Sequence, residues 1–160
     1  MSNTQENLTL IAEKIKGMRT AMFVTMNEKG QHVGRPMSTQ DIEFDGTVFF
    51  ITHKDSNKVT HIKNNPEVGL MYGEGVKHVS LSGLAEVSQD KAKIKELWSE
   101  FYKAWFEGED DPNIAVIKVK VSRAEYWDYP GGKVGAYVDM AKSAVTGHQA
   151  DNGENCVFEF

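Results

Sequence analysis

The chain has 160 residues, of which 40% are hydrophobic and 26% are charged, and its formal net charge is −5 with a pI near 5.5. This length fits one domain over residues 1–160 with a sizeable core. The acidic balance argues against general nucleic-acid binding and against an anionic membrane partner. The single cysteine, Cys156, excludes an internal disulfide and any multi-cysteine metal site.

The N-terminal segment, residues 5–17, has the pattern of a short amphipathic helix that Gly17 ends. It lacks the basic and apolar regions of a signal peptide, and no apolar run in the chain reaches the length of a membrane span. We therefore expect a cytoplasmic protein with no membrane partner. The apolar residues of the helix recur at helical spacing: Leu8, Ile11, Ala12 and Ile15.

Two extended segments follow this helix. Residues 20–27 have an apolar strand pattern, and residues 32–44 resume in extended form after a turn at EKGQ. Pro36 lies inside the second segment. Because proline has no N–H group to donate, we expect that segment to avoid a central position in a sheet.

The dipeptide Asp45-Gly46 is typical of a hairpin turn. It lies between DIEF, residues 41–44, and TVFFIT, residues 47–52. The pattern predicts that these two segments are antiparallel neighbours in the sheet.

The stretch ITHKDSNKVTHIKNNP, residues 51–66, combines lysines with small polar side chains where a strand gives way to a helix. Ser56 or Asp55 is suited to cap a helix that carries Val59 and Ile62 on one face and ends at NNP. The residues alone leave two interpretations open. The stretch is either a capped, solvated turn or a seat for an anion such as a cofactor phosphate.

Two strands and a helix come next. Residues 67–72 and 76–88 are joined by GEG, and the second segment alternates between apolar and polar positions. Residues 90–106 predict one long helix, whose broad apolar face favours a core or a subunit interface over a cofactor site. That face holds Ile94, Leu97, Trp98, Phe101, Tyr102, Trp105 and Phe106.

The C-terminal part begins with a long strand pattern over residues 114–129, bent near Ser122. Residues 134–145 predict a last helix, and a polar tail with a short apolar end begins at residue 147. The hairpin-linked strands lack the strand–helix alternation of a parallel sheet. We therefore expect a mainly β fold of the α+β type, a small antiparallel barrel with peripheral helices.

Familiar catalytic and metal-binding motifs are missing from the sequence. The five histidines show no zinc spacing, and neither HExxH nor GxSxG occurs. In PGGKVG, residues 130–135, the lysine is followed by valine and not by the Ser or Thr of a phosphate loop. We therefore expect no metal site and assign no catalytic residue.

Two basic and polar clusters remain, GRPMST at residues 34–39 and the stretch at 51–66. Arg35 is able to hold a phosphate through two N–H groups, whereas Lys58 acts as a point charge. Ser56 and the first amide N–H groups of the following helix add donors, and the helix dipole favours an anion. The same residue types are also common on ordinary protein surfaces, so the clusters alone do not decide between an anion site and a solvated surface.

In their order along the chain, these segments resemble the pyridoxamine-5′-phosphate-oxidase-like flavin proteins, and among them the general stress protein branch. The similar segments span roughly residues 8–130: GRPM, FFIT, SNKV, NNPEVGLMY, HVSLSGLAEV and DDPNIAVIKVKVSRAEYWD. The resemblance implies a six-stranded antiparallel split barrel with Greek-key connections, followed by a C-terminal helix and tail over residues 131–160. It also implies a homodimer that binds FMN in a groove between its subunits.

The FMN contacts implied by the resemblance come from both clusters and from two later strands. Arg35, Ser56 and Lys58 would neutralise the phosphate, and backbone groups near Met37 and Thr52 would contact the edge of the ring. The full set is Arg35, Pro36, Met37, Ser38, Ile51, Thr52, Ser56, Asn57, Lys58, His78 and Trp127.

Three positions in this set need comment. Asn57 stands where the oxidase has a basic residue, which lowers the positive charge at the phosphate. His78 stands where the oxidase has a glutamine that faces the flavin. Trp127 is the aromatic residue that the second subunit would bring near the ring.

The sequence also lacks the arginine-rich end of the oxidase, because its three arginines are Arg19, Arg35 and Arg123. Oxidation of pyridoxamine phosphate is therefore not expected. The resemblance implies an FMN-dependent oxidoreductase of unknown substrate, with a reduced nicotinamide as one candidate electron donor. Two alternatives stay open: a flavin-binding stress module without turnover, and a related barrel that binds haem or a deazaflavin.

Overall fold

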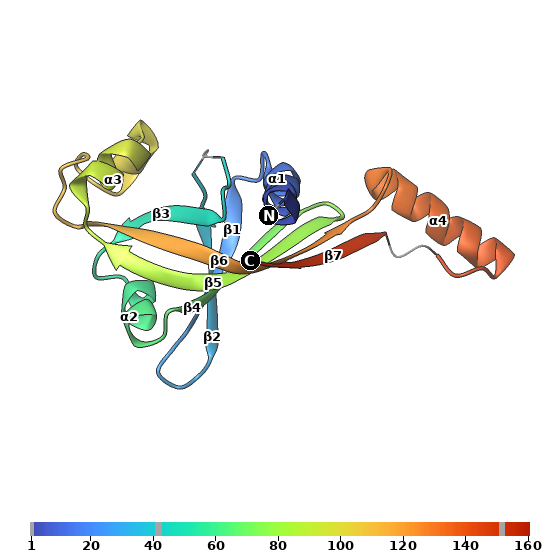
Figure 1. Ribbon diagram of the computed structural model, residues 1–160, viewed down its shortest axis with the longest axis horizontal. Helices are drawn as coiled ribbons and strands as arrows, with labels where there is room; N and C mark the ends of the chain where they lie inside the picture. The colour runs from blue at the N-terminus through green and yellow to red at the C-terminus, as the bar shows by residue number, and fades with distance from the viewer. Residues whose placement is uncertain (1, 41–42, 151–152) are drawn as a thin grey trace.

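The computed structural model describes residues 2–40, 43–150 and 153–160, and Figure 1 shows how the elements are arranged. Its strands are antiparallel, and the helices lie around the sheet. The elements in chain order are α1 (Ser2–Ile15), β1 (Thr20–Met26), β2 (His32–Ser38), β3 (Thr47–His53), α2 (Asn57–Asn64), β4 (Glu67–Glu74), β5 (Lys77–Ser88), α3 (Lys91–Leu97), the 3-10 helix η1 (Glu100–Ala104), β6 (Ile114–Asp128), α4 (Gly132–Thr146) and β7 (Glu154–Glu159).

The seven strands form one sheet in the order β2-β1-β4-β5-β6-β3, and β7 pairs with β6 beyond this path. The sheet curls, so that β1 and β2 cross β3, β5 and β6 at a steep angle (Figure 1). β2 and β3 follow one another in the chain, yet they occupy the two ends of the path and do not pair with each other. The barrel is therefore split between two edge strands.

The main core lies on the inner face of the curled sheet. Phe23 from β1 and Phe50 from β3 are fully buried there, and their rings meet edge to face with centroids 5.1 Å apart. A second, smaller cluster forms where Ile51 and Ile94 pack with Tyr102 beneath α3 and η1. These aromatic contacts hold β1 and β3 in place although they are not neighbours in the sheet.

The β5–β6 ladder contains a bulge at Ser122. Ser82 pairs with Arg123 whereas Gly83 pairs with Val121, so Ser122 has no partner across the ladder, and its hydroxyl donates to the Ser82 carbonyl at 3.3 Å. A Cβ atom at Gly83 would lie 2.2 Å from the Lys120 carbonyl oxygen. Only glycine permits this close approach of the two backbones.

The predicted fold class is confirmed, with a seventh strand added. The Pro36 argument was sound, because β2 is an edge strand. The expected alternation along β5 also holds, since Val79, Leu81 and Ala85 are buried on its inner face. The bend predicted near Ser122 corresponds to the bulge.

The predicted hairpin at Asp45-Gly46 is wrong. Residues 43–44 are not in a strand, and residues 41–42 of the expected DIEF strand lie outside the described residues. The dipeptide does form a tight turn, with Gly46 at φ +103° and the Asp45 carboxylate accepting from the Thr47 amide at 3.1 Å. However, β2 pairs with β1, and β3 pairs with β6 from Thr47↔Lys120 onward. A turn signal identifies a change of direction but not the strand that pairs after it.

The single long helix predicted for residues 90–106 is also wrong. α3 ends at Leu97 and a 3-10 helix follows, because Trp98 and Ser99 both adopt extended backbone conformations. Tyr102 and Phe106 are buried as expected, whereas Phe101 and Trp105 are exposed. Breaking the helix lets the chain turn so that only part of the aromatic face packs on β6 and β3.

The C-terminal part forms an arm. β6 and β7 run outward together, and α4 lies at their far end (Figure 1). The tail contains a seventh strand that the sequence did not predict, while α4 covers the predicted helix with small differences at both ends. No residue of α4 is buried. No helix in the described part of the chain is both long and apolar enough to cross a membrane.

Candidate functional site

Two polar side chains are buried in the described part of the chain, and both are threonines, Thr25 and Thr52. Each accepts a hydrogen bond from a cationic side chain. The Arg35 Nη1 atom lies 2.8 Å from Thr25 Oγ1, and the Lys58 Nζ atom lies 3.0 Å from Thr52 Oγ1. The two cations are thus fixed by hydroxyl groups that the barrel itself holds in place.

Arg35 is placed by the β1–β2 ladder. It pairs with Phe23, so its side chain projects from the same face of the sheet as Phe23 and Thr25. Its Nη1 atom also donates to the Phe23 carbonyl at 3.3 Å. Pro36 and Ser38 alternate with it and project from the opposite face, so the predicted segment divides between two faces.

Lys58 is placed by α2, which Val59 and Ile62 anchor in the core. Ser56 occupies the N-cap position with extended backbone, as one of the two predicted caps, but its side chain makes no capping hydrogen bond. Its hydroxyl lies 3.4 Å from Thr52 Oγ1 instead. The Ser56 hydroxyl therefore lies beside the start of a helix, where free amide N–H groups favour an anion.

The two cations lie close enough to affect each other. Burial lowers the pKa of Lys58, and the positive charge of Arg35 lowers it further. Burial also lowers the pKa of Arg35. Among the ion pairs of the described residues, none involves either side chain. Two half-buried, mutually repelling cations without a carboxylate partner form a site that an anion would stabilise.

Thr25 on β1 and His61 on α2 complete this cluster, and the sequence analysis did not predict either residue. Thr25 Oγ1 lies 2.8 Å from the Nδ1 atom of His61, which projects from α2 one turn after Lys58. The hydrogen bonds therefore run from Arg35 on β2 through Thr25 on β1 to His61 on α2. The one available signal was Thr25 itself, a hydroxyl inside an otherwise apolar strand.

Three other predicted residues are close to this cluster in sequence, but none of them belongs to its hydrogen-bond network. Met37 packs against the main core on the face that Arg35 uses. The Ile51 side chain is buried in the second cluster, so only its backbone is available to a ligand. Asn57 is exposed at the first position of α2.

His78 and Trp127 are not brought together with this cluster in one chain. They pair with each other across β5 and β6, whereas Thr52 pairs with Ala115 near the opposite end of β6. At about 3.3 Å per residue, the part of β6 between Ala115 and Trp127 is at most about 40 Å long, so Trp127 lies at the opposite end of the strand from Thr52. Both side chains are exposed.

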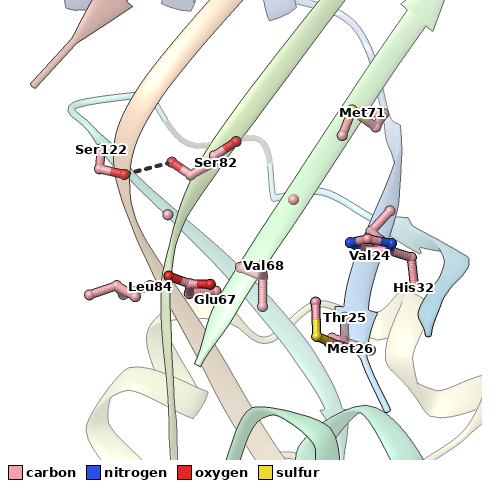
Figure 2. A pocket seen from close by; sticks show the side chains of 12 residues that line it. Val24, Thr25, Met26, His32, Glu67, Val68, Met71, Ser82, Leu84 and Ser122 are labelled. Atoms are coloured by element: carbon pink, nitrogen blue, oxygen red, sulfur yellow. Dashed lines mark hydrogen bonds between the residues drawn. The ribbon is translucent and has the colours of Figure 1, made fainter. Parts of the chain in front are cut away.

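A shallow hollow of about 360 Å³ lies over β1, β4, β5 and β6 (Figure 2). Met71 and Leu84 are exposed along it, and Glu67 and His32 also line it. The Ser122–Ser82 hydrogen bond crosses its wall (Figure 2). The hollow lacks the paired cations of the Arg35–Lys58 cluster, and its exposed methionine and leucine side chains are typical of a contact surface.

The structure is a split antiparallel barrel with a cationic seat, formed by Arg35 and Lys58, beside its edge strands. Comparisons with known proteins identify the class to which it belongs. Residues 6–151 match the family described as pyridoxamine 5′-phosphate oxidase like. General stress protein 26 of Bacillus subtilis (strain 168) is 31% identical over 94 residues, which cover 54% of this chain and 67% of that protein. The chain therefore belongs to the pyridoxamine 5′-phosphate oxidase like family.

Solved structures agree with this assignment. A crystal structure assigned to general stress protein 26 from Jannaschia sp. CCS1 is 25% identical and covers all of both chains, with a TM-score of 0.75. The general stress FMN/FAD binding protein of Xanthomonas citri is 26% identical with a TM-score of 0.63, over 79% of this chain and 89% of that chain. The split-barrel fold expected from the sequence is thereby confirmed.

Proposed function

We propose that this protein binds FMN and acts as a flavin-dependent oxidoreductase of the general stress protein type. The observation that carries the proposal is the pair of half-buried cations, Arg35 and Lys58, which has no carboxylate partner among the described residues. A phosphate monoester carries close to two negative charges near neutral pH, which matches this pair. The Xanthomonas citri relative, described as an FMN/FAD binding protein, supports a flavin as the rest of the ligand.

The residues of this chain would divide the work of binding. Arg35 and Lys58 would hold the phosphate, and Ser56 with the first amides of α2 would add neutral donors. Backbone groups near Met37 and Thr52 would contact the ring edge. The bound flavin would supply the electron transfer itself, since redox chemistry belongs to the cofactor.

The proposal includes a homodimer with FMN between the subunits. His78 and Trp127 lie at the opposite end of β6 from the residue that pairs with Thr52, so in this proposal they would reach the flavin from a second copy. Met22, Met71 and Leu84 leave apolar area exposed on the outer face of the sheet, which a second copy would cover.

A flavin-binding module without turnover is the second candidate. One observation favours it: His61 is the histidine next to the cations, and its Nδ1 atom is already engaged by Thr25. No carboxylate pairs with Arg35 or Lys58 among the described residues, so a general acid or base beside the phosphate is not evident. Substrate protonation, if it occurs, would then depend on groups outside this cluster.

The binding proposal is tested with the double variant Arg35→Ala, Lys58→Ala. Each charged contact contributes about 1.5–3 kcal/mol, so FMN affinity should fall by at least about a hundredfold, measured by quenching of flavin fluorescence. Riboflavin, which has no phosphate, should bind the variant nearly as well as the wild type. Lys54→Ala is the matched control, because it removes a nearby lysine that is not hydrogen-bonded to Thr52.

Three results would contradict the binding proposal. Wild-type protein that takes up no FMN would end it, and absorbance near the haem Soret band would favour the haem-binding alternative. Equal losses of FMN and riboflavin affinity in the double variant would show that the cations do not contact the phosphate. If the wild type binds FMN, oxidation of NADH or NADPH with an electron acceptor would separate an enzyme from an inert module.

The dimer is tested separately by sedimentation equilibrium. We expect twice the chain mass of 17.9 kDa, and we expect Met71→Glu to shift the protein toward monomer because it buries a charge in the proposed contact. Trp105→Glu, at an exposed position directly after η1, is the control and should leave the mass unchanged. A wild-type monomer at micromolar concentration would contradict the proposal.

A further inference from the structure

We propose that Thr25 and His61 are positioning residues that orient Arg35 and Lys58 for a phosphate monoester. This inference rests on the proposed function, because it concerns the same phosphate. Neither residue belongs to the set implied by the resemblance to flavin proteins. Its basis is the continuous hydrogen-bond path Arg35–Thr25–His61, with distances of 2.8 Å at both steps.

The direction of the hydrogen bond between Arg35 and Thr25 follows from chemistry. A guanidinium group donates only, so Thr25 Oγ1 accepts from Arg35. The Thr25 hydroxyl is then able to donate to His61 Nδ1 when the imidazole carries its proton on Nε2, and the proposal includes this tautomer. Thr25 is almost completely buried, with 1% of its surface exposed, so water cannot replace either partner.

The consequence for Arg35 is a fixed orientation. Nη1 is held by Thr25 Oγ1 and by the Phe23 carbonyl, at 2.8 and 3.3 Å. Nε and Nη2 have no partner among the hydrogen bonds of the described residues. They form the edge of the guanidinium group that binds an anion with two parallel hydrogen bonds. Without Thr25, the side chain would lose the contact that turns this edge away from the barrel.

The consequence for Lys58 is a fixed distance from Arg35. His61 lies one turn after Lys58 on the same helix, so the Thr25–His61 bond ties α2 to β1 at the level of the cations. Thr52 holds the Lys58 ammonium group from the other side at 3.0 Å. The two buried threonines thus hold the Arg35 and Lys58 side chains in place before an anion binds. Less reorganisation of these side chains is then needed on binding.

The test compares variants that keep shape with variants that keep the hydrogen bond. Thr25→Val and His61→Phe preserve most of the volume but remove the path, whereas Thr25→Ser and His61→Asn retain a hydroxyl and an acceptor near the Nδ1 position. We expect the first two to lower FMN affinity by about tenfold, the effect of one hydrogen bond to a charged group. Riboflavin affinity should change less than twofold, and the two conservative variants should bind FMN as the wild type does.

A double-mutant cycle separates positioning from general damage. In an Arg35→Ala, Lys58→Ala background, Thr25→Val should cause no further loss of FMN affinity, because both side chains that it positions are gone. Equal losses of FMN and riboflavin affinity, or a Thr25→Ser variant as weak as Thr25→Val, would overturn the inference. So would full FMN affinity in Thr25→Val.

Failure of this inference is distinguishable from failure of the proposed function. If the wild type binds no FMN, the proposed function fails, and inorganic phosphate becomes the probe. Phosphate should then raise the melting temperature of the wild type and of Thr25→Ser more than that of Thr25→Val. Equal stabilisation of all three, or stabilisation of none, would overturn the positioning role on its own terms.

Discussion

The two ends of the β5–β6 ladder differ in how much of their surface one chain covers. Near the start of β6, the strand pairs with β3. There, the Thr52 hydroxyl accepts a hydrogen bond from Lys58 on α2. At the other end, His78 and Trp127 are exposed, and α4 buries none of its residues. The first end gathers two half-buried cations, which we propose bind an anion. The second end exposes side chains that the proposed dimer would cover.

The largest expected effect concerns the barrel under the first end. Phe50→Ala should lower the free energy of unfolding by about 3–5 kcal/mol, because it removes a fully buried ring that packs on Phe23. Val145→Ala on α4 should change it by less than about 0.5 kcal/mol, since that side chain is 87% exposed. Denaturant titration measures both. A cost of more than 1 kcal/mol for Val145→Ala would mean that a second copy covers α4.

A smaller effect on stability is expected at the cationic seat. Lys58→Met should stabilise the protein without ligand by about 0.5–1 kcal/mol at pH 7, because it removes a half-buried charge that Arg35 repels. The folded pKa of Lys58 lies below its ordinary value of 10.5. The unfolded chain therefore binds more protons at pH values between the two, and wild-type stability from this group rises with pH across that window.

The advantage of Lys58→Met should consequently shrink as the pH approaches 10, and FMN should reverse the order of stability at neutral pH. Thermal unfolding across pH 7–10, with and without FMN, measures both trends. Lys58→Arg is the control, because it keeps the charge and should keep the penalty. A Lys58→Met protein that is less stable than the wild type at pH 7 would show that the charged lysine does not destabilise the folded state.

The smallest effect concerns the attachment of the arm. The Tyr129 hydroxyl donates to the Asp139 carboxylate at 2.6 Å, and this bond joins α4 to the end of β6. Asp139→Ala should cost about 1 kcal/mol, confined to α4. Hydrogen exchange should accelerate over residues 132–146 while FMN affinity stays unchanged. Weaker FMN binding, or faster hydrogen exchange across the whole barrel, would contradict the separation of the two ends.

Most elements were predictable from the sequence because their signals are local. Helical spacing located α1, α2 and α4, and the alternation of Val79, Leu81 and Ala85 located β5. The pairing of β3 with β6 was not predictable from Asp45-Gly46, because partner choice depends on contacts between residues distant in sequence. The strand β7 was missed for the same reason: its apolar run is only three residues long, at 156–158, and its pairing with β6 is what makes it a strand.

The candidate site was predictable only as far as charge allows. Arg35, Ser56 and Lys58 could be selected because few residue types bind phosphate, and the structure does gather them around Thr52 and Thr25. Thr25 and His61 gave no such signal. A threonine in a strand and a histidine on a helix are ordinary residues until folding places their atoms 2.8 Å apart.

The bulge at Ser122 decides which of two neighbouring aromatic side chains the chain displays. Before it, odd-numbered residues such as Val119 and Val121 point inward, and after it the even-numbered Tyr126 is buried while Trp127 faces outward. The extra residue at Ser122 thus shifts the in-and-out alternation of side chains by one position. If β6 kept Ser122 but ran past it with regular alternation and no bulge, the tryptophan would face the core and the tyrosine the surface.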